Sequence, residues 1–259
     1  MPKFAANLSM LFQEHAFLDR FEAASNSGFR HVEYLFPYDY RPEALKELLD
    51  QHYLEQVLFN LPPGDWSKGE RGIACLPNRR DEFKRGVEQA IHYAEILQVP
   101  RVNCLAGILP TNHSNSEAWD CLLDNIEYAA DQLKSVDIKL VVEAINSKVD
   151  MPGFCLDTIE KSQTLLSQLN HENLGFQFDL YHMHIMHGDL VRSLDQIWPD
   201  IAHVQFADSP GRHEPGTGDI DFSTTFKHLD KQGYQGFVSA EYLPKDDTVS
   251  SLAWLRTFN

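Results

Sequence analysis

Eight short stretches rich in β-branched and aromatic residues recur along the chain, and we predict that each is a buried strand. They are nearly continuous apolar runs, which is typical of parallel strands that are covered on both faces. The runs lie at residues 4–9, 31–36, 55–61, 101–107, 139–144, 174–180, 201–207 and 236–242.

The segments between these runs have the periodicity of amphipathic helices. Phe17, Phe21 and Ala24 follow a three- and four-residue spacing, and similar patterns occupy residues 87–97 and 249–258. Eight strand-then-helix units in 259 residues predict an α/β fold, a single (β/α)₈ TIM barrel spanning residues 1–259 as one domain. A doubly wound open sheet is the alternative, but no G-x-G-x-x-G motif follows the first run to favour it.

Three long polar segments follow predicted strands. They are residues 62–80, 145–154 and the loop within "HVQFADSPGRHEPGTGDIDF" at 203–222. In a parallel barrel the loops after the strands gather at one end, where side chains from several strand ends share a pocket. We therefore expect the functional site among these loops.

Four consecutive predicted strands end in a polar residue: Glu143, Asp179, Gln205 and Glu241. A single acidic residue at such a position is most often a helix N-cap or a solvated charge. If the three carboxylates approach within about 4 Å, however, each pair repels by about 4 kcal/mol at an effective dielectric constant near 20. Either bound protons or a divalent cation must offset this repulsion, and the oxygen-rich set favours Mg²⁺ or Mn²⁺.

Three histidines follow Asp179 in the segment "YHMHIMHGD". His182 lies three residues beyond Asp179, close enough to the strand end to contact a substrate. His184 and His187 lie further on, in a predicted helix, and we expect them to be solvated or capping histidines rather than metal ligands.

Charge and cysteine content narrow the classes of function. The chain has 22 basic and 38 acidic residues, a formal net charge of −16, which argues against binding to nucleic acid or to an anionic membrane. No apolar run of about eighteen residues or signal-peptide pattern is present, so a cytoplasmic location is expected. The four cysteines are widely spaced and are predicted to be buried, reduced thiols.

Several long motifs resemble the hydroxypyruvate isomerases of the xylose-isomerase-like TIM barrel superfamily. They include "FAANLSMLF", "NLPPGDWSKGERGIACLPNR", "FDLYHMH" and "HVQFADSPGRHEPGTGDIDF", and the resemblance runs nearly from end to end. The D-x-x-H pattern of the superfamily falls on Asp179 and His182.

The resemblance also implies roles for individual residues. The paired acid/base glutamates fall on Glu143 and Glu241, and the metal ligand of the seventh strand falls on Gln205, where related sugar epimerases usually have histidine. Arg212 falls where related epimerases have a substrate-binding arginine, so it is expected to bind the substrate carboxylate. The alternative for Arg212 is an ion pair at the rim with Glu214 or Asp208.

The implied reaction is the interconversion of hydroxypyruvate and tartronate semialdehyde through an enediol(ate), a step of glyoxylate metabolism. The implied cofactor is a divalent metal, Mg²⁺ or Mn²⁺, held by the four polar strand ends. A 2-oxo-tetronate isomerase or a ketose 3-epimerase with a larger substrate is the enzymatic alternative, and a metal-dependent DNA-repair endonuclease is disfavoured by the acidic charge.

The sequence leaves open whether the chain forms a homo-oligomer. Asn7, Glu33 and Asn60, also near strand ends, could line the pocket.

Overall fold

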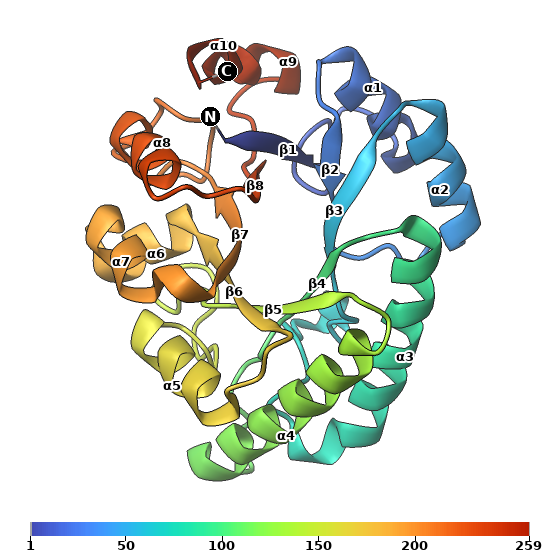
Figure 1. Ribbon diagram of the computed structural model, residues 1–259, viewed down its shortest axis with the longest axis vertical. Coiled ribbons are helices and arrows are strands. Elements are labelled where there is room, and N and C mark those ends of the chain that lie inside the picture. Colours follow the sequence, from blue (N-terminus) through green and yellow to red (C-terminus); the bar gives the residue numbers. More distant parts are fainter. Residues whose placement is uncertain (1, 259) are drawn as a thin grey trace.

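The computed structural model describes residues 2–258, and in it eight parallel strands close into a barrel in chain order (Figure 1). The barrel predicted from the sequence is confirmed. Each strand begins within one residue of the start of a predicted apolar run. It ends one to three residues before the end of that run, because the last residues of the run belong to the following loop or helix. The strands are β1 (Lys3–Asn7), β2 (His31–Glu33), β3 (Glu55–Asn60), β4 (Arg101–Cys104), β5 (Lys139–Glu143), β6 (Leu174–Asp179), β7 (Ile201–Phe206) and β8 (Phe237–Ala240).

Helices surround the barrel and cover the strands from outside (Figure 1). They are α1 (Arg20–Asn26), α2 (Pro42–Gln51), α3 (Arg80–Leu97), α4 (Asn115–Lys134), α5 (Ile159–Leu169), α6 (Leu180–His187), α7 (Leu190–Ile197), α8 (Phe222–Lys231), α9 (Thr248–Ser251) and α10 (Leu255–Phe258). No described helix is long and apolar enough to cross a membrane.

The final helical segment is broken, although its periodicity resembled that of the others. A 3-10 turn, Leu252–Trp254, separates α9 from α10. The Trp254 indole donates to the Tyr242 hydroxyl over 3.0 Å and packs edge-on against Phe4 and Phe206. These contacts override the weak local preference for one continuous helix.

Local capping fixes where several helices begin. The N-terminus of α4 has a capping box, in which the Ser114 hydroxyl accepts from the Glu117 amide and the Glu117 carboxylate accepts from the Ser114 amide. Asp179, the last residue of β6, is also the N-cap of α6. The strand therefore passes directly into the helix at the position where the sequence placed a site residue.

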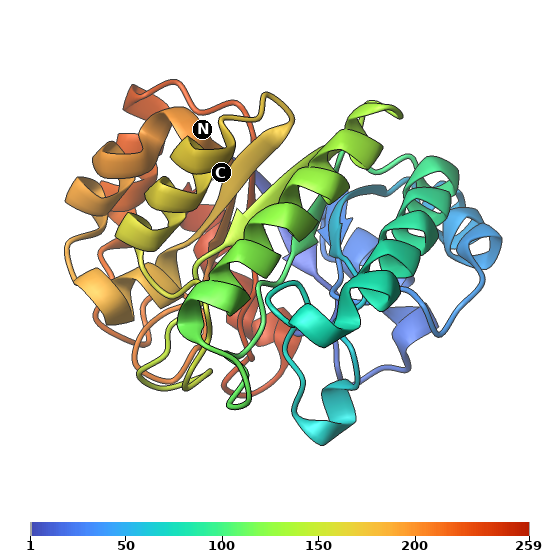
Figure 2. The same cartoon turned by 90° about the horizontal axis from the view of Figure 1, so that it is seen from below.

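At the mouth of the barrel, polar side chains of β1 and β5 lie above apolar ones, whereas β6, β7 and β8 carry buried Gln177, His203 and Ser239 in the layer below. Ala5 and Val141 belong to a small buried cluster, separate from the main core, and each lies two residues before a polar residue, Asn7 or Glu143. Side chains two apart on a strand share a face, so the polar groups lie above the apolar ones. Figure 2 shows the loops after the strands gathered on one side, with residues 62–80 (cyan) reaching furthest.

The four cysteines are buried and free, as the sequence predicted. Burial raises the pKa of the Cys104 thiol well above its ordinary value, which makes this residue a poor nucleophile.

Candidate active site

Glu143, Asp179, Gln205 and Glu241 lie side by side at the carboxyl ends of β5, β6, β7 and β8. The strand register places Asp179 opposite Gln205, and Glu241 follows directly after β8. All four residues are at most 4% exposed. Because buried carboxylates are rare unless they are paired or bound, this set is the candidate functional site.

Asp179 uses only one of its two oxygens to cap α6. Its Oδ1 accepts from the backbone amides of Tyr181 and His182, at 2.7 and 3.2 Å. Its Oδ2 is buried and has no hydrogen-bond partner within residues 2–258. The capping role that the sequence offered as the ordinary explanation is therefore correct, and the other oxygen lies 3.8 Å from His182 Nε2 and 3.9 Å from Arg212 Nη2.

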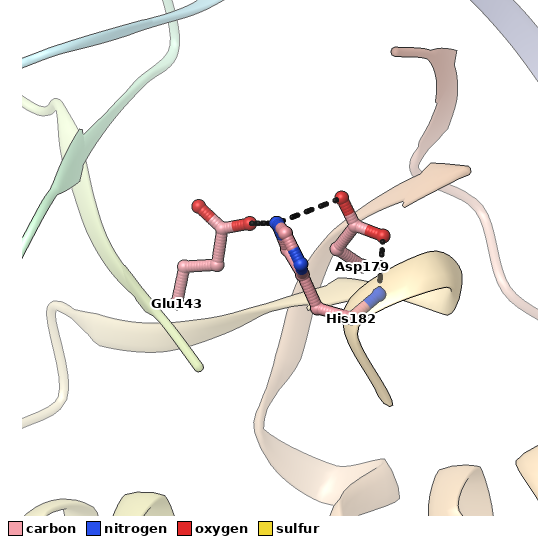
Figure 3. Close-up of side chains that lie close together, drawn as sticks. All are labelled: Glu143, Asp179 and His182. Atoms are coloured by element: carbon pink, nitrogen blue, oxygen red, sulfur yellow. Dashed lines mark hydrogen bonds and ion pairs between the residues drawn. The ribbon is translucent and has the colours of Figure 1, made fainter. Parts of the chain in front are cut away.

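Glu143, Asp179 and His182 form a compact cluster that could hold a metal ion, with one candidate ligand atom from each within 4.8 Å of the others. Figure 3 shows the two carboxylates approaching the same ring nitrogen of His182. Nε2 lies 3.9 Å from Glu143 Oε1 and 3.8 Å from Asp179 Oδ2. Burial lowers the pKa of His182 to about 4, so the ring is neutral near pH 7.

The two glutamates are held in different surroundings. Burial, followed by the charges of Glu241 and Asp179, raises the pKa of Glu143 well above its ordinary value. Burial raises the pKa of Glu241 to about 8, although Arg212 opposes the shift. Both carboxyl groups therefore bind a proton more readily than a solvated glutamate, a property that suits general acid/base groups.

Arg212 points into the site instead of out to the rim. Its Nη2 lies 2.6 Å from Glu241 Oε2 and 3.9 Å from Asp179 Oδ2, and its guanidinium lies over the Tyr181 ring. The alternative pairing with Glu214 or Asp208 is wrong. The Nε of Arg212 is buried and has no hydrogen-bond partner in the described chain, so one donor remains for a ligand.

Asp208 organises the loop that carries Arg212, which explains why that loop is so polar. Its carboxylate accepts from the backbone amides of Ser209, Gly216, Thr217, Gly218 and Ile220. A Cβ on Gly218 would lie 2.3 Å from the Ser209 carbonyl oxygen, so only glycine fits there.

A second polar layer lies beneath the site, and the sequence pointed to its Glu33 and Asn7 but not to His203. Glu33 is fully buried and accepts from His203 Nε2 at 2.7 Å, Gln205 Nε2 at 2.6 Å and Asn7 Nδ2 at 3.0 Å. Asn7 also donates to Glu241 over 3.1 Å. His203 and Gln205 are two apart in β7, and this strand parity was the available signal that His203 faces the interior.

Of the remaining predicted groups, His187 has a structural partner, whereas the buried Oδ1 of Asn60 has none in the described chain. Asn103 and Asn146, which the sequence did not single out, contact site residues. His187 Nε2 accepts from the Ile159 amide at the start of α5, a capping contact as expected. The Nδ2 of Asn103, on β4, donates to Glu143 over 3.2 Å. Asn146 contacts the His182 ring, and no sequence pattern marked it, because it lies in an irregular loop.

The acidic set fits a divalent cation. The unpaired Oδ2 of Asp179 and the raised pKa values of Glu143 and Glu241 all show too little positive charge among these carboxylates. Of the predicted ligands, Glu143 and Asp179 lie in the cluster with His182. Glu241 lies beside them, and its Oε1 is 3.4 Å from the amide nitrogen of Gln205. The charge deficit and the oxygen donors suit Mg²⁺ or Mn²⁺.

Relatives with curated names cover the whole chain. The chain is 46% identical over 256 residues to "Hydroxypyruvate isomerase" of Escherichia coli (strain K12), covering 98% of both chains. It is 40% identical over 258 residues to "2-oxo-tetronate isomerase" of Cupriavidus necator, covering 100% of this chain and 99% of that protein.

Solved structures and a family model agree with the barrel. A crystal structure from Brucella melitensis, titled AP endonuclease family 2, superposes with a TM-score of 0.96 at 40% identity and covers both chains fully. A 3-keto-D-glucoside 4-epimerase from E. coli, at 19% identity, has a TM-score of 0.81 over 99% of this chain and 100% of its own, and shares the fold. The model described as "Xylose isomerase-like TIM barrel" matches residues 21–258. This chain therefore belongs to the xylose isomerase-like TIM barrel family.

Proposed function

We propose that this protein is a hydroxypyruvate isomerase, which interconverts hydroxypyruvate and tartronate semialdehyde. The observation that carries the proposal is a pair of buried carboxyl groups, Glu143 and Glu241, that share one pocket with a neutral histidine and an inward-pointing arginine. The E. coli relative named hydroxypyruvate isomerase supports this choice of substrate.

The reaction moves a carbonyl group between adjacent carbons by proton transfer. One glutamate takes a proton from C3 while the C2 carbonyl oxygen gains one, which gives the enediol. A proton is then delivered to C2 and the O3 hydroxyl loses its proton, which leaves the aldehyde. Glu143 and Glu241 serve as base and acid and exchange roles with the direction of the reaction, and such groups typically contribute about 10²–10⁴-fold to the rate.

Arg212 and His182 bind the substrate. The guanidinium fork suits bidentate pairing with the substrate carboxylate, and it provides local positive charge in a protein of net charge −16. The His182 ring, which is neutral, faces a substrate oxygen.

The proposed cofactor is Mg²⁺ or Mn²⁺, held by Glu143, Asp179, Gln205 and Glu241. When bound, such a cation stabilises negative charge that develops on the substrate oxygens. Gln205 holds its amide oxygen toward Gln177 and its amide nitrogen toward Glu33, so a ligand role for Gln205 requires its amide to rotate.

A 2-oxo-tetronate isomerase is the second candidate, because relatives with that name are 40% identical to this chain. A ketose 3-epimerase-like activity is a further alternative. In all cases the proposed partner is a small molecule rather than nucleic acid. The proposed location of the enzyme is the cytoplasm. The proposal allows either a monomer or a homo-oligomer.

The test incubates chelator-treated protein with hydroxypyruvate in deuterated water, with and without Mg²⁺ or Mn²⁺, and follows tartronate semialdehyde by NMR. We expect product with deuterium incorporated from the solvent. Turnover of a four-carbon 2-oxo acid but not of hydroxypyruvate would support the second candidate, and no turnover of either would refute both.

A further inference from the structure

Asn146 contacts the side of the His182 ring that faces away from the proposed substrate. Asn146 is fully buried, and its Nδ2 lies 2.7 Å from His182 Nδ1. Neither the acid/base chemistry nor the metal ligands proposed above uses Asn146.

The hydrogen-bond network fixes which way the Asn146 amide points. Its Oδ1 accepts from the backbone amides of Val149 and Asp150, both at 3.0 Å. The amide nitrogen therefore faces His182 Nδ1 and the Asp150 carboxylate. One amide hydrogen of Asn146 then points to His182 Nδ1 and the other to the Asp150 carboxylate, so the side-chain donors and acceptor are all used. If the amide were flipped, its oxygen would face the Asp150 carboxylate, which is unfavourable.

A donor facing Nδ1 determines where the ring proton lies. A neutral imidazole has one N–H, and the hydrogen bond made by one nitrogen sets the protonation of the other. Because Nδ1 accepts from Asn146, the proton lies on Nε2. The Asp150 carboxylate does not compete, since its Oδ2 is 3.9 Å from Nδ1, beyond hydrogen-bond range.

The opposite side of the ring favours the same tautomer. Nε2 faces the unpaired Asp179 Oδ2 at 3.8 Å, an acceptor that attracts an N–H but is too far away to bind it directly, and Glu143 Oε1 lies at 3.9 Å. The Nε2–H is thus an unused donor aimed into the site. In this tautomer Nε2 has no lone pair for a metal ion, although the ring lies in a cluster of potential ligands.

We propose that Asn146 is a positioning residue that holds His182 as the Nε2–H tautomer, so that His182 donates a hydrogen bond to a substrate oxygen and does not bind the metal. The use of this hydrogen bond in the reaction rests on the proposed function. The tautomer itself does not, because it can be measured without substrate.

The test is a long-range ¹H–¹⁵N correlation spectrum of chelator-treated protein with ¹⁵N-labelled histidine rings, which shows the nitrogen that carries the proton. The signal of His182 is identified by its loss in His182→Gln. His171 is an internal reference for the Nε2–H form, because its Nδ1 accepts from the Asn173 amide at 3.1 Å. His213 is the reference for the opposite form, because its Nδ1 lies 2.7 Å from the Leu243 carbonyl oxygen.

We expect the His182 pattern of the wild-type protein to match that of His171. A pattern like that of His213, or a doubly protonated ring, overturns the proposal, and this outcome does not depend on whether Asn146→Asp folds. An inactive protein with the Nε2–H form would remove the proposed function but keep the tautomer assignment.

The variant Asn146→Asp replaces the donor facing Nδ1 with a carboxylate, so we expect the proton to move to Nδ1. The loss of one donor to the substrate should lower kcat by about 10²–10³-fold. The control is Asn125→Asp, an equally buried site whose amide donates to the Ala74 carbonyl away from His182. An unchanged His182 tautomer in folded Asn146→Asp contradicts the proposal.

Discussion

The substitution Arg212→Lys tests whether the guanidinium binds the substrate carboxylate. The Nη2 of Arg212 pairs with Glu241, and its buried Nε has no partner in the described structure. One guanidinium can therefore hold Glu241 and a ligand together. A lysine ammonium keeps the charge but cannot reproduce the planar fork.

The expected magnitude follows from the hydrogen bonds lost. If lysine retains the contact with Glu241, the substrate loses at least one charge-assisted hydrogen bond, about 1.5–3 kcal/mol. Since 1.4 kcal/mol is a factor of ten, KM for hydroxypyruvate should rise by about 10- to 100-fold. The retained positive charge should keep the thermal midpoint of unfolding within about 4 °C of wild type.

The assay is steady-state kinetics of Arg212→Lys beside Arg80→Lys, a surface arginine that pairs with Asp124. The control should leave KM unchanged. A KM for Arg212→Lys within twofold of wild type, in a folded protein, would refute the clamp.

Four further predictions concern the same pocket. Glu143→Gln and Glu241→Gln should each lower kcat at least about 100-fold, and turnover within threefold of wild type would remove the assignment. Because burial raises the pKa of Glu241 from 4.5 to about 8, the folded state binds this proton more tightly than the unfolded state. In chelator-treated protein its contribution to stability is therefore present below pH 4.5 and is lost as the pH rises to about 8. The free energy of unfolding, measured with urea across this pH range, should decline less in Glu241→Gln than in the wild-type protein. Equal declines in the two proteins would contradict the raised pKa of Glu241. Mg²⁺ or Mn²⁺ should stabilise chelator-treated protein by about 2.7 kcal/mol at 100-fold excess over its Kd, an effect that Asp179→Asn should abolish in thermal melts. Asp208→Asn should cost about 1–3 kcal/mol for each loop amide left unpaired, measured by urea unfolding, and should raise KM through Arg212; unchanged stability would show that Asp208 does not hold the loop.

Much of the site could be predicted because the barrel converts strand order into position. Apolar runs identified the strands, and the carboxyl ends of parallel strands meet at one end of a barrel. Glu143, Asp179 and Glu241 were therefore placed together without any knowledge of distances. The D-x-x-H motif of the superfamily added His182, which lies one helical turn beyond Asp179.

The orientation of individual side chains could not be predicted. For Arg212, both an inward clamp and a rim ion pair with Glu214 or Asp208 were compatible with the loop sequence. The structure decides between them, because the Asp208 carboxylate is occupied by five backbone amides of its own loop.

The sequence by itself determined the barrel and the residues at its mouth, because periodicity and strand order are local properties of the chain. Only the tertiary structure decided the partners. Glu33 meets His203 across 170 residues of sequence, and Asn146 meets His182 across 36. Such contacts depend on the closure of the barrel and on the course of irregular loops. The protonation of a buried group depends on these partners, so its chemistry becomes visible only after the chain has folded.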